Sequence, residues 1–404
     1  MEKLAFFTER AHLMCPRMGF SLLGTLDAPL DGARLQAVLA QLTQAHPLLR
    51  ARLGHEARGN CFYYDLQPEG QTELRIVPAP EKVEDALALH ETQTARDWNL
   101  TAEGMLKILC WPQGQRTGVL FTFHHLLADG RGALGLLREF AEGYVQGLPP
   151  QSVPEKLIGQ EDFPAGSELP WISRRIMESA NRRWAGEEHE PLSYGEYHAW
   201  AQCFLEKDAV THRLEDLSAE ETEALRRQCR AEGITVNDYW LGRMLAEEGA
   251  REVVMAADLR AEVPCYRPGS LGNFATAFTV RVNGAGSDAL AAAKKAHSAV
   301  EKARKNPAAR YTVLQCYAML NPALLDAAAM AGLGAYPSRA AAFVGGQLFG
   351  FARRAGHSVT NLGTLDCAGL GRTYFIPPAS PAMQKTWGIV TVNGEMTRVC
   401  CERA

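Results

Sequence analysis

The chain alternates strand-like and helix-like segments almost from its start, and this alternation limits it to the fold classes that mix sheet and helix. Residues 18–26 (MGFSLLGTL) read as a strand, and apolar residues then recur at helical spacing from Leu35 to Leu42, ending before Pro47. Further strands are expected at 48–53, 61–66, 74–77, 105–111 and 118–124, with helices at 82–98 and from Gly130 onward.

A proline-rich stretch separates this half from a second one. Gly147 to Pro170 contains five prolines and little periodicity, which indicates a connection between domains. We therefore expect two mixed α/β domains, 1–160 and 161–404. In the second half, Ser218 and Thr235 each open a capping box, and Asn393-Gly394 predicts a tight hairpin. Strands are expected there at 253–257 and 274–282, and a helix at 287–305.

Composition excludes several classes of protein. The 404 residues are 47% hydrophobic and 22% charged, which is typical of a globular chain and not of a disordered one. A net charge of -4 lacks the basic excess that nucleic-acid binding needs, so no nucleic-acid partner is expected. No export signal or 18-residue apolar run is present, so we expect a cytoplasmic protein with no membrane span. The ten cysteines form no metal-binding spacing, so no metal is expected.

Two adjacent histidines, His124 and His125, close the expected strand at 118–124, and a loop carrying Asp129 and Gly130 leads into the next helix. Because neighbouring strand residues point to opposite faces, the two imidazoles cannot share one cavity or one metal ion. We expect His125 to face a reaction cavity as a general base and His124 to pack on the reverse side. For Asp129, a helix N-cap is an equally good interpretation, and it is compatible with an ion pair.

The pattern His124-His125-x-x-x-Asp129-Gly130 resembles the signature of the chloramphenicol acetyltransferase-like superfamily. That group includes condensation domains of peptide synthetases, plant acyltransferases, wax-ester synthases and alcohol acetyltransferases. Other segments similar to the superfamily follow in its order along most of the chain: AHPLLRARL at 45–53, GITVND at 233–238, DLR at 258–260, LGNF at 271–274 and SVTNLG at 358–363. A late D-F-G-W-G element of the plant members is missing, which disfavours that branch.

The resemblance implies two similar mixed-sheet α/β domains in a V-shaped pseudo-dimer, with a tunnel between them. It places the catalytic histidine at His125, with His124 as structural support, and a structural aspartate at Asp129. An arginine would hold that aspartate, and Arg50 is the expected one. Arg52 fits nearly as well on composition, and Arg52 or Arg260 is next in line if Arg50 lies away from Asp129. The backbone N–H of Gly130 could approach the reacting carbonyl.

Polar residues of the second half are candidate contacts for the substrate or for a developing oxyanion: Ser358, Thr360, Asn361 and Arg260. Each has a plainer alternative. Residues 358–363 could simply be a strand end with a turn, and Arg260 could lie at the tunnel or bind between domains. Asn273 reads more readily as a turn or strand-edge residue than as part of a site.

The function that follows is a stand-alone acyltransferase, moving acyl groups other than aminoacyl groups. It would take an acyl group from a thioester, with acyl-CoA as the expected donor, and pass it to a hydroxyl or amine acceptor. No bound cofactor is expected. The alternative is a condensation enzyme whose donor is carried on the phosphopantetheine of an acyl carrier protein. A non-catalytic scaffold is the third hypothesis, and the intact His125, Asp129 and Gly130 set argues against it.

Overall fold

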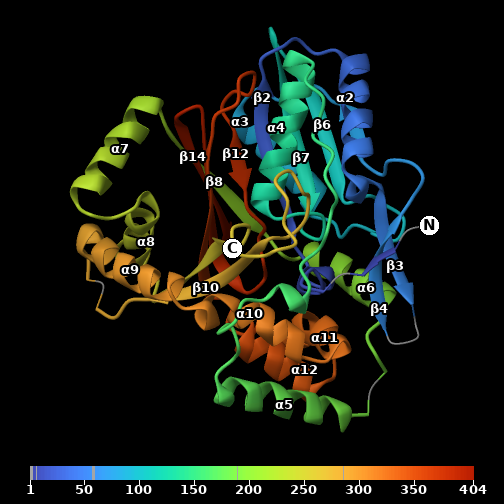
Figure 1. The fold of residues 1–404 in the computed structure, drawn as a ribbon, viewed down its shortest axis with the longest axis vertical. Coiled ribbons are helices and arrows are strands. Elements are labelled where there is room, and N and C mark those ends of the chain that lie inside the picture. Colours follow the sequence, from blue (N-terminus) through green and yellow to red (C-terminus); the bar gives the residue numbers. More distant parts are fainter. Residues whose placement is uncertain (1–2, 6, 57–59, 189, 285) are drawn as a thin grey trace.

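The computed structural model describes residues 3–5, 7–56, 60–188, 190–284 and 286–404 (Figure 1). Its strands form three sheets with the orders β12-β2-β7-β6-β5, β10-β9-β11-β13-β14-β8 and β1-β4-β3. The strands are β1 Lys3–Ala5, β2 Gly19–Leu26, β3 Ala51–Glu56, β4 Cys61–Leu66, β5 Glu73–Ile76, β6 Leu106–Gln113, β7 Arg116–His124, β8 Val210–Leu217, β9 Glu252–Asp258, β10 Ala275–Arg281, β11 Gly356–Leu365, β12 Tyr374–Ile376, β13 Met383–Val392 and β14 Glu395–Arg403.

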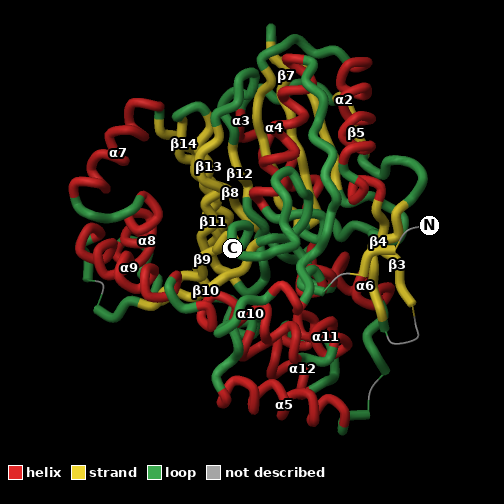
Figure 2. The backbone as a smooth tube through the Cα atoms, in the orientation of Figure 1, coloured by secondary structure: helices red, strands yellow, loops and turns green. Residues whose placement is uncertain are grey.

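The helices lie around these sheets (Figure 2). They are α1 Arg10–Leu13, α2 Gly32–Ala45, α3 Val83–Thr94, α4 Gly130–Gln146, α5 Trp171–Ala185, α6 Tyr194–Leu205, α7 Ala219–Ala231, α8 Val236–Ala246, α9 Ala289–Arg304, α10 Pro307–Met319, α11 Pro322–Gly332 and α12 Arg339–Phe343, with short 3-10 turns η1 Pro47–Arg50 and η2 Gln160–Asp162 and a π-helical turn η3 Val344–Leu348.

The five-stranded sheet is covered on both faces because its central strand, β7, is apolar on both. Phe121 and Phe123 pack in one core with Leu137 of α4, whereas Leu120 packs on the other face with Leu87 of α3. This layering explains why β7 reads as a continuous hydrophobic run and not as an alternating one. The sheet ends with β12, which comes from the second half of the chain and pairs antiparallel with β2.

The six-stranded sheet carries helices α7, α8 and α9 on one face, visible at the left of Figure 1. Trp240 and Leu241 of α8 pack there against Trp387 and Ile389 of β13. Strands β9 and β11 are parallel, and β11 is also parallel to β13, so the sheet is mixed. A third group of helices, α5, α10, α11 and α12, lies below both sheets in the same view.

Most expected elements are present. Ser218 and Thr235 accept the backbone N–H groups of their capping boxes, and Asn393 and Gly394 have φ values of 49° and 87° in the β13–β14 hairpin. One strand lies further along the chain than expected at 48–53: residues 47–50 form η1, and the strand runs from Ala51 to Glu56. A proline at the first position favours that helical turn. The proposed boundary between 1–160 and 161–404 stays a prediction.

Across the described ranges, none of the helices combines the length and the apolar character needed to cross a bilayer.

Candidate active site

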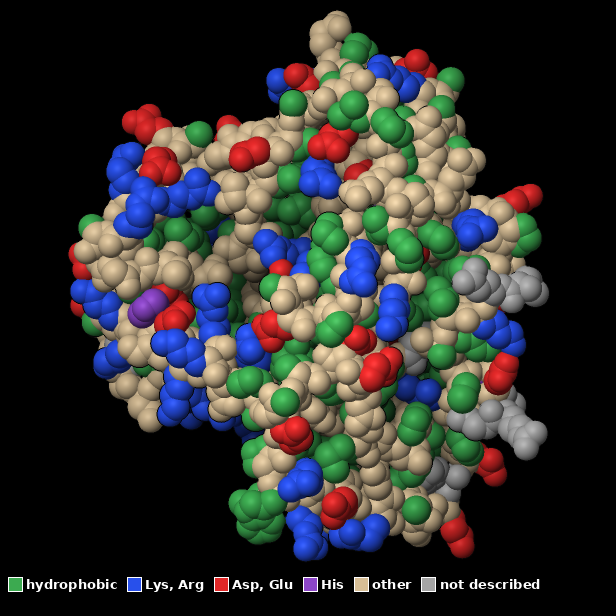
Figure 3. Space-filling view, in the orientation of Figure 1, with side chains coloured by type: hydrophobic (Ala, Val, Ile, Leu, Met, Phe, Trp, Pro, Cys, Tyr) green, Lys and Arg blue, Asp and Glu red, His purple; other side chains and the backbone are tan. Residues whose placement is uncertain are grey.

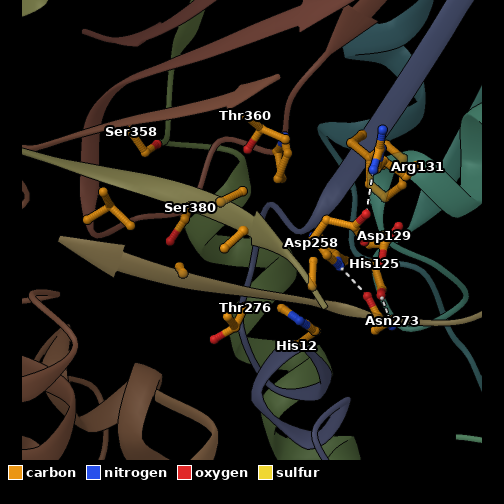
Figure 4. Close-up of a pocket in the computed structure, with 18 of the residues that line it drawn as sticks. His12, His125, Asp129, Arg131, Asp258, Asn273, Thr276, Ser358, Thr360 and Ser380 are labelled. Atoms are coloured by element: carbon orange, nitrogen blue, oxygen red, sulfur yellow. Dashed lines mark hydrogen bonds and ion pairs between the residues drawn. The ribbon is translucent and has the colours of Figure 1, made fainter. Parts of the chain in front are cut away.

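A cavity of about 300 Å³ lies between the β7–α4 junction and the second sheet. His125, Asp129 and Gly130 line it from the first half of the chain. Residues of β9, β10 and β11 line it from the second half, with Asn273 just ahead of β10 (Figure 4). The segment singled out in the sequence therefore borders the cavity that both halves build.

Asn273 fixes the orientation and the tautomer of His125. Its amide Nδ2 donates to the carbonyl oxygens of His125 and Leu126 at 2.9 and 3.1 Å. Those two carbonyls can only accept, so the amide oxygen must face the other way, toward Nδ1 of His125 at 3.1 Å. Nδ1 therefore carries the proton, and Nε2 keeps the lone pair that a general base needs.

The surroundings of His125 keep its imidazole neutral. Burial lowers the pKa of His125, and its own backbone, Asp129 and Asn273 oppose this only in part. His12 of α1 stacks on the ring, with centroids 4.1 Å apart and planes 18° from parallel. Burial, His125 and His124 hold the pKa of His12 well below its usual range, so neither stacked ring is charged at neutral pH.

His124 is the non-cavity partner that the strand geometry predicted. It is buried at the end of β7 and is absent from the described walls of the cavity that His125 lines. Its Nδ1 accepts the backbone N–H of Leu126 at 3.3 Å, and burial lowers its pKa to about 3. This neutral ring supports the backbone of the loop that follows His125.

Asp129 is held by Arg260 and not by Arg50, so the expected Arg50–Asp129 pair is wrong. Arg260 donates Nη1 to Oδ2 at 3.0 Å and Nη2 to Oδ1 at 2.8 Å, a bidentate pair across 131 residues of chain. The backbone N–H groups of Gly132 and Phe274 donate to the same carboxylate at 2.8 and 2.7 Å. These four donors occupy both oxygens of Asp129.

The electrostatics of this pair are those of a buried structural link. Burial alone would raise the pKa of Asp129, but the guanidinium of Arg260 and the two backbone donors bring it below its usual range. Arg260 also donates to Asp258 at 2.9 Å. Asp129 is both the N-cap of α4 and an ion-pair partner, so the two interpretations of this residue hold together. Arg260 also lines the cavity, as one interpretation of it expected, and its contact with a substrate stays a prediction.

Gly130 begins α4 and lines the cavity. A Cβ at this position would lie 2.5 Å from Cδ2 of the buried Leu362, so a larger residue would have to displace that side chain. This packing does not test the second role expected of Gly130, in which its backbone N–H donates to the reacting carbonyl, and that role stays a prediction.

Ser358, Thr360 and Asn361 all line the cavity from β11, and Figure 4 shows Ser358 and Thr360 on the side away from His125. The hydroxyl of Ser358 donates to Thr386 at 3.0 Å. Asn361 donates to Asn237 at 2.6 Å and accepts from the backbone of Gly363. Two of these three candidates are therefore engaged in structural hydrogen bonds.

Sequence reasoning missed two residues of the site. Asn273 belongs to the LGNF segment, so its place in the resemblance was a signal, but it was interpreted as a turn. His12 has no local motif, and only the tertiary fold brings it onto His125. The side chains of a separate group, His90, Glu91 and His212, lie close enough together to bind one metal ion, but they are not part of the cavity wall. The carboxylate of Glu91 already accepts a hydrogen bond from Arg17 at 2.7 Å.

The family can be assigned once this geometry is compared with known proteins. Residues 20–242, more than half of the chain, match the family model described as the condensation domain. The chain belongs to the condensation-domain family. This family supports a transferase acting on acyl groups as the type of activity. Comparison with curated protein sequences returned no match.

Solved structures agree with this condensation-domain assignment. Trichothecene 15-O-acetyltransferase TRI3 from Fusarium sporotrichioides is 12% identical with a TM-score of 0.63, covering 99% of this chain and 90% of that one. The first condensation domain of the calcium-dependent antibiotic synthetase is 17% identical with a TM-score of 0.59, covering 99% and 90%. The condensation domain of the monacolin K polyketide synthase MokA is 10% identical with a TM-score of 0.60, covering 100% and 92%.

At these identities the likeness concerns the fold. It confirms the expected class, a mixed α/β protein of the chloramphenicol acetyltransferase-like type, and it confirms the resemblance seen in the sequence.

Proposed function

We propose that the protein is an acyltransferase that moves an acyl group from an acyl-CoA thioester to a hydroxyl or amine acceptor. The observation that carries the proposal is the hydrogen bond between Asn273 and Nδ1 of His125, which leaves an unprotonated Nε2 for the cavity. A base held neutral by burial suits proton abstraction near pH 7.

The reaction can be written with these residues alone. The acceptor oxygen or nitrogen attacks the thioester carbonyl carbon while its proton passes to Nε2 of His125. When the tetrahedral intermediate collapses, the carbon–sulfur bond breaks, and the protonated imidazole returns its proton to the leaving thiolate. Transient charge on His125 is stabilised by the nearby Asp129 carboxylate and by the Asn273 oxygen.

The oxyanion needs a preorganised donor close to His125. The first turn of α4 offers one, because helix N-termini present unpaired N–H groups and the positive end of the helix dipole. Gly130 lies at this turn and borders the cavity, so its N–H is the donor we assign. Thr360 of β11 also lines the cavity, but on the side away from His125, so it suits a contact with another part of a substrate.

A carrier-protein donor is the second candidate, and the family assignment favours it. Charge on the surface suits either donor, since both carry phosphate. Blue side chains gather at the left of Figure 3, where α7 and α9 lie in Figure 1. The exposed cations of these two helices include Arg227, Arg230, Lys294, Lys295, Lys302 and Arg304, of which Arg230, Lys294 and Arg304 pair with glutamates. The two donors would be told apart by comparing kcat/KM for one acyl group presented on CoA and on a phosphopantetheinyl carrier protein.

The test of the proposal is thiol release from a panel of acyl-CoA thioesters, each mixed with a panel of alcohols and amines. We expect release that depends on the acceptor, with equimolar ester or amide. Intact-protein mass spectrometry after mixing with acyl-CoA alone should show unmodified protein, because transfer is direct. A stoichiometric acyl adduct on a serine or cysteine would refute the mechanism.

A further inference from the structure

A second and larger chamber, of about 560 Å³, adjoins the cavity of His125. The two spaces share wall residues, among them His12, Ala277, Val313 and Tyr317. His12 lies where they meet, stacked on His125. A molecule that reaches Nε2 of His125 can therefore extend past His12 into the second chamber.

The walls of the second chamber are mostly apolar, and many of the side chains that form them are small. Alanines from three helices line it, Ala303 of α9, Ala309 of α10 and Ala329 of α11, together with phenylalanine and methionine side chains. Helix α9 lies at the left of Figure 1 and helices α10 and α11 lie in its lower part, away from the five-stranded sheet. Small side chains leave room between closely packed helices. Hydroxyl groups of Thr279, Thr312 and Ser380 also line the chamber, but apolar side chains make up most of its wall.

Charge in these walls is already neutralised. Arg10 binds Asp326 with Nε at 2.8 Å and Nη2 at 2.6 Å in a buried pair. Arg281 pairs with Glu252 at 2.6 Å at the exposed rim of the chamber, where its side chain is 72% exposed to solvent. Burial raises the pKa of the Cys15 thiol to about 12, so this group is also uncharged. The described part of the chamber wall thus offers no unpaired charge to a ligand.

We infer that the second chamber binds an aliphatic chain belonging to one of the two substrates, so that this enzyme acts on a long-chain acyl donor or a long-chain acceptor. The inference rests on the proposed function for the identity of the ligand, since the chain must be attached to a group that reacts at His125. Pockets of this size lined by apolar residues favour apolar ligands, and each buried methylene strengthens binding.

The experiment measures binding of each substrate alone, which needs no turnover. One series is acyl-CoA thioesters and the other is 1-alkanols, both from four to twelve carbons and below the concentration at which micelles form, titrated by calorimetry. In one series we expect Kd to fall about fourfold for each added methylene, and that series identifies the substrate that bears the chain. Dependence on chain length in neither series would overturn the inference.

Two variants place the effect in the chamber. Ala309→Trp and Ala329→Phe fill it from different helices, and each should abolish the gain from the longer chains while leaving four-carbon ligands unaffected. Ala309 is only half-buried and tolerates a large side chain more readily, so it decides the question if Ala329→Phe does not fold. Ala33→Trp, on the exposed face of α2, is the matched control and should keep the full chain-length dependence.

The outcomes separate this inference from the function it rests on. A steep series that Ala309→Trp leaves unchanged would overturn the chamber assignment. A flat series in an enzyme whose turnover still depends on His125 would refute the chamber alone. Full turnover in His125→Ala, with the steep series intact, would refute the proposed mechanism and leave the chamber assignment standing.

Discussion

The ion pair between Asp129 and Arg260 gives the sharpest prediction about how the site is held. Asp129→Asn keeps the shape of the side chain but replaces one carboxylate oxygen with an NH2 group. In the wild type, each oxygen of Asp129 accepts one guanidinium N–H and one backbone N–H. In either orientation of the amide, its NH2 group would therefore lie against two other hydrogen-bond donors. Arg260 would keep only Asp258 as an ionic partner.

The magnitude follows from burial. Asp129 is 4% exposed and the Arg260 side chain 12%, so solvent cannot replace the lost interaction. Breaking a buried pair by changing one partner costs about 3–5 kcal/mol, and we expect a loss of that size in the free energy of unfolding measured with urea. Arg260→Met should cost a similar amount, because it strands the carboxylate. The double variant should cost clearly less than the sum, which measures the coupling.

An exposed pair supplies the control. Glu252→Gln breaks the pair with Arg281, whose side chain is 72% exposed, and should change stability far less than Asp129→Asn does. A loss below about 1 kcal/mol in Asp129→Asn would refute the reasoning, since it would mean that the pair contributes no more than a surface one. The four hydrogen bonds that Asp129 accepts come from Arg260, Gly132 and Phe274, and none of them comes from Arg50. Arg50→Met should therefore leave turnover nearly unchanged.

Three further predictions concern the histidines and the glycine. His124 stays neutral in the folded protein, where its pKa is about 3, whereas in the unfolded chain it takes up a proton below its ordinary pKa of about 6.5. The free energy of unfolding should therefore fall as the pH drops below about 6.5, by about 2 kcal/mol at pH 5 for this residue. His124→Gln should make that dependence on pH flatter in urea titrations at several pH values. Asn273→Asp places a carboxylate on Nδ1 of His125 and should raise its pKa, moving the acid limb of the kcat/KM profile to higher pH; an unmoved limb would contradict the contact. Gly130→Ala should lower stability by about 1–3 kcal/mol through its clash, whereas Gly135→Ala, in the same helix with open space around it, should raise it by about 0.5–1 kcal/mol in thermal melts.

The sequence predicted the fold well where nearby residues determine where a helix or strand begins and ends. The capping boxes at Ser218 and Thr235 and the Asn393-Gly394 turn all lie where expected, because each is decided by residues within one turn of the chain. The pairing of β12 with β2 could not be predicted in this way. It joins Tyr374 to Leu23, and no local pattern reports which sheet a three-residue strand will complete.

In the site too, features that depend on neighbouring residues were predicted, and contacts between distant parts of the chain were not. The strand phase placed His125 at the cavity and His124 away from it, because side-chain alternation is a local property. The partner of Asp129 was wrong, since an ion pair between positions 129 and 260 depends on how the two halves meet. His12 was missed for the same reason: its stacking on His125 is a contact across more than a hundred residues.

The most direct test of the central claim, that Nε2 of His125 accepts the acceptor's proton, is kcat/KM of His125→Ala relative to the wild type on one thioester and acceptor pair. We predict a loss of about 10²–10⁴-fold with the unfolding midpoint nearly unchanged. A variant that is folded and keeps kcat/KM within about threefold of the wild type would contradict the account, because that ratio is far below what a general base contributes.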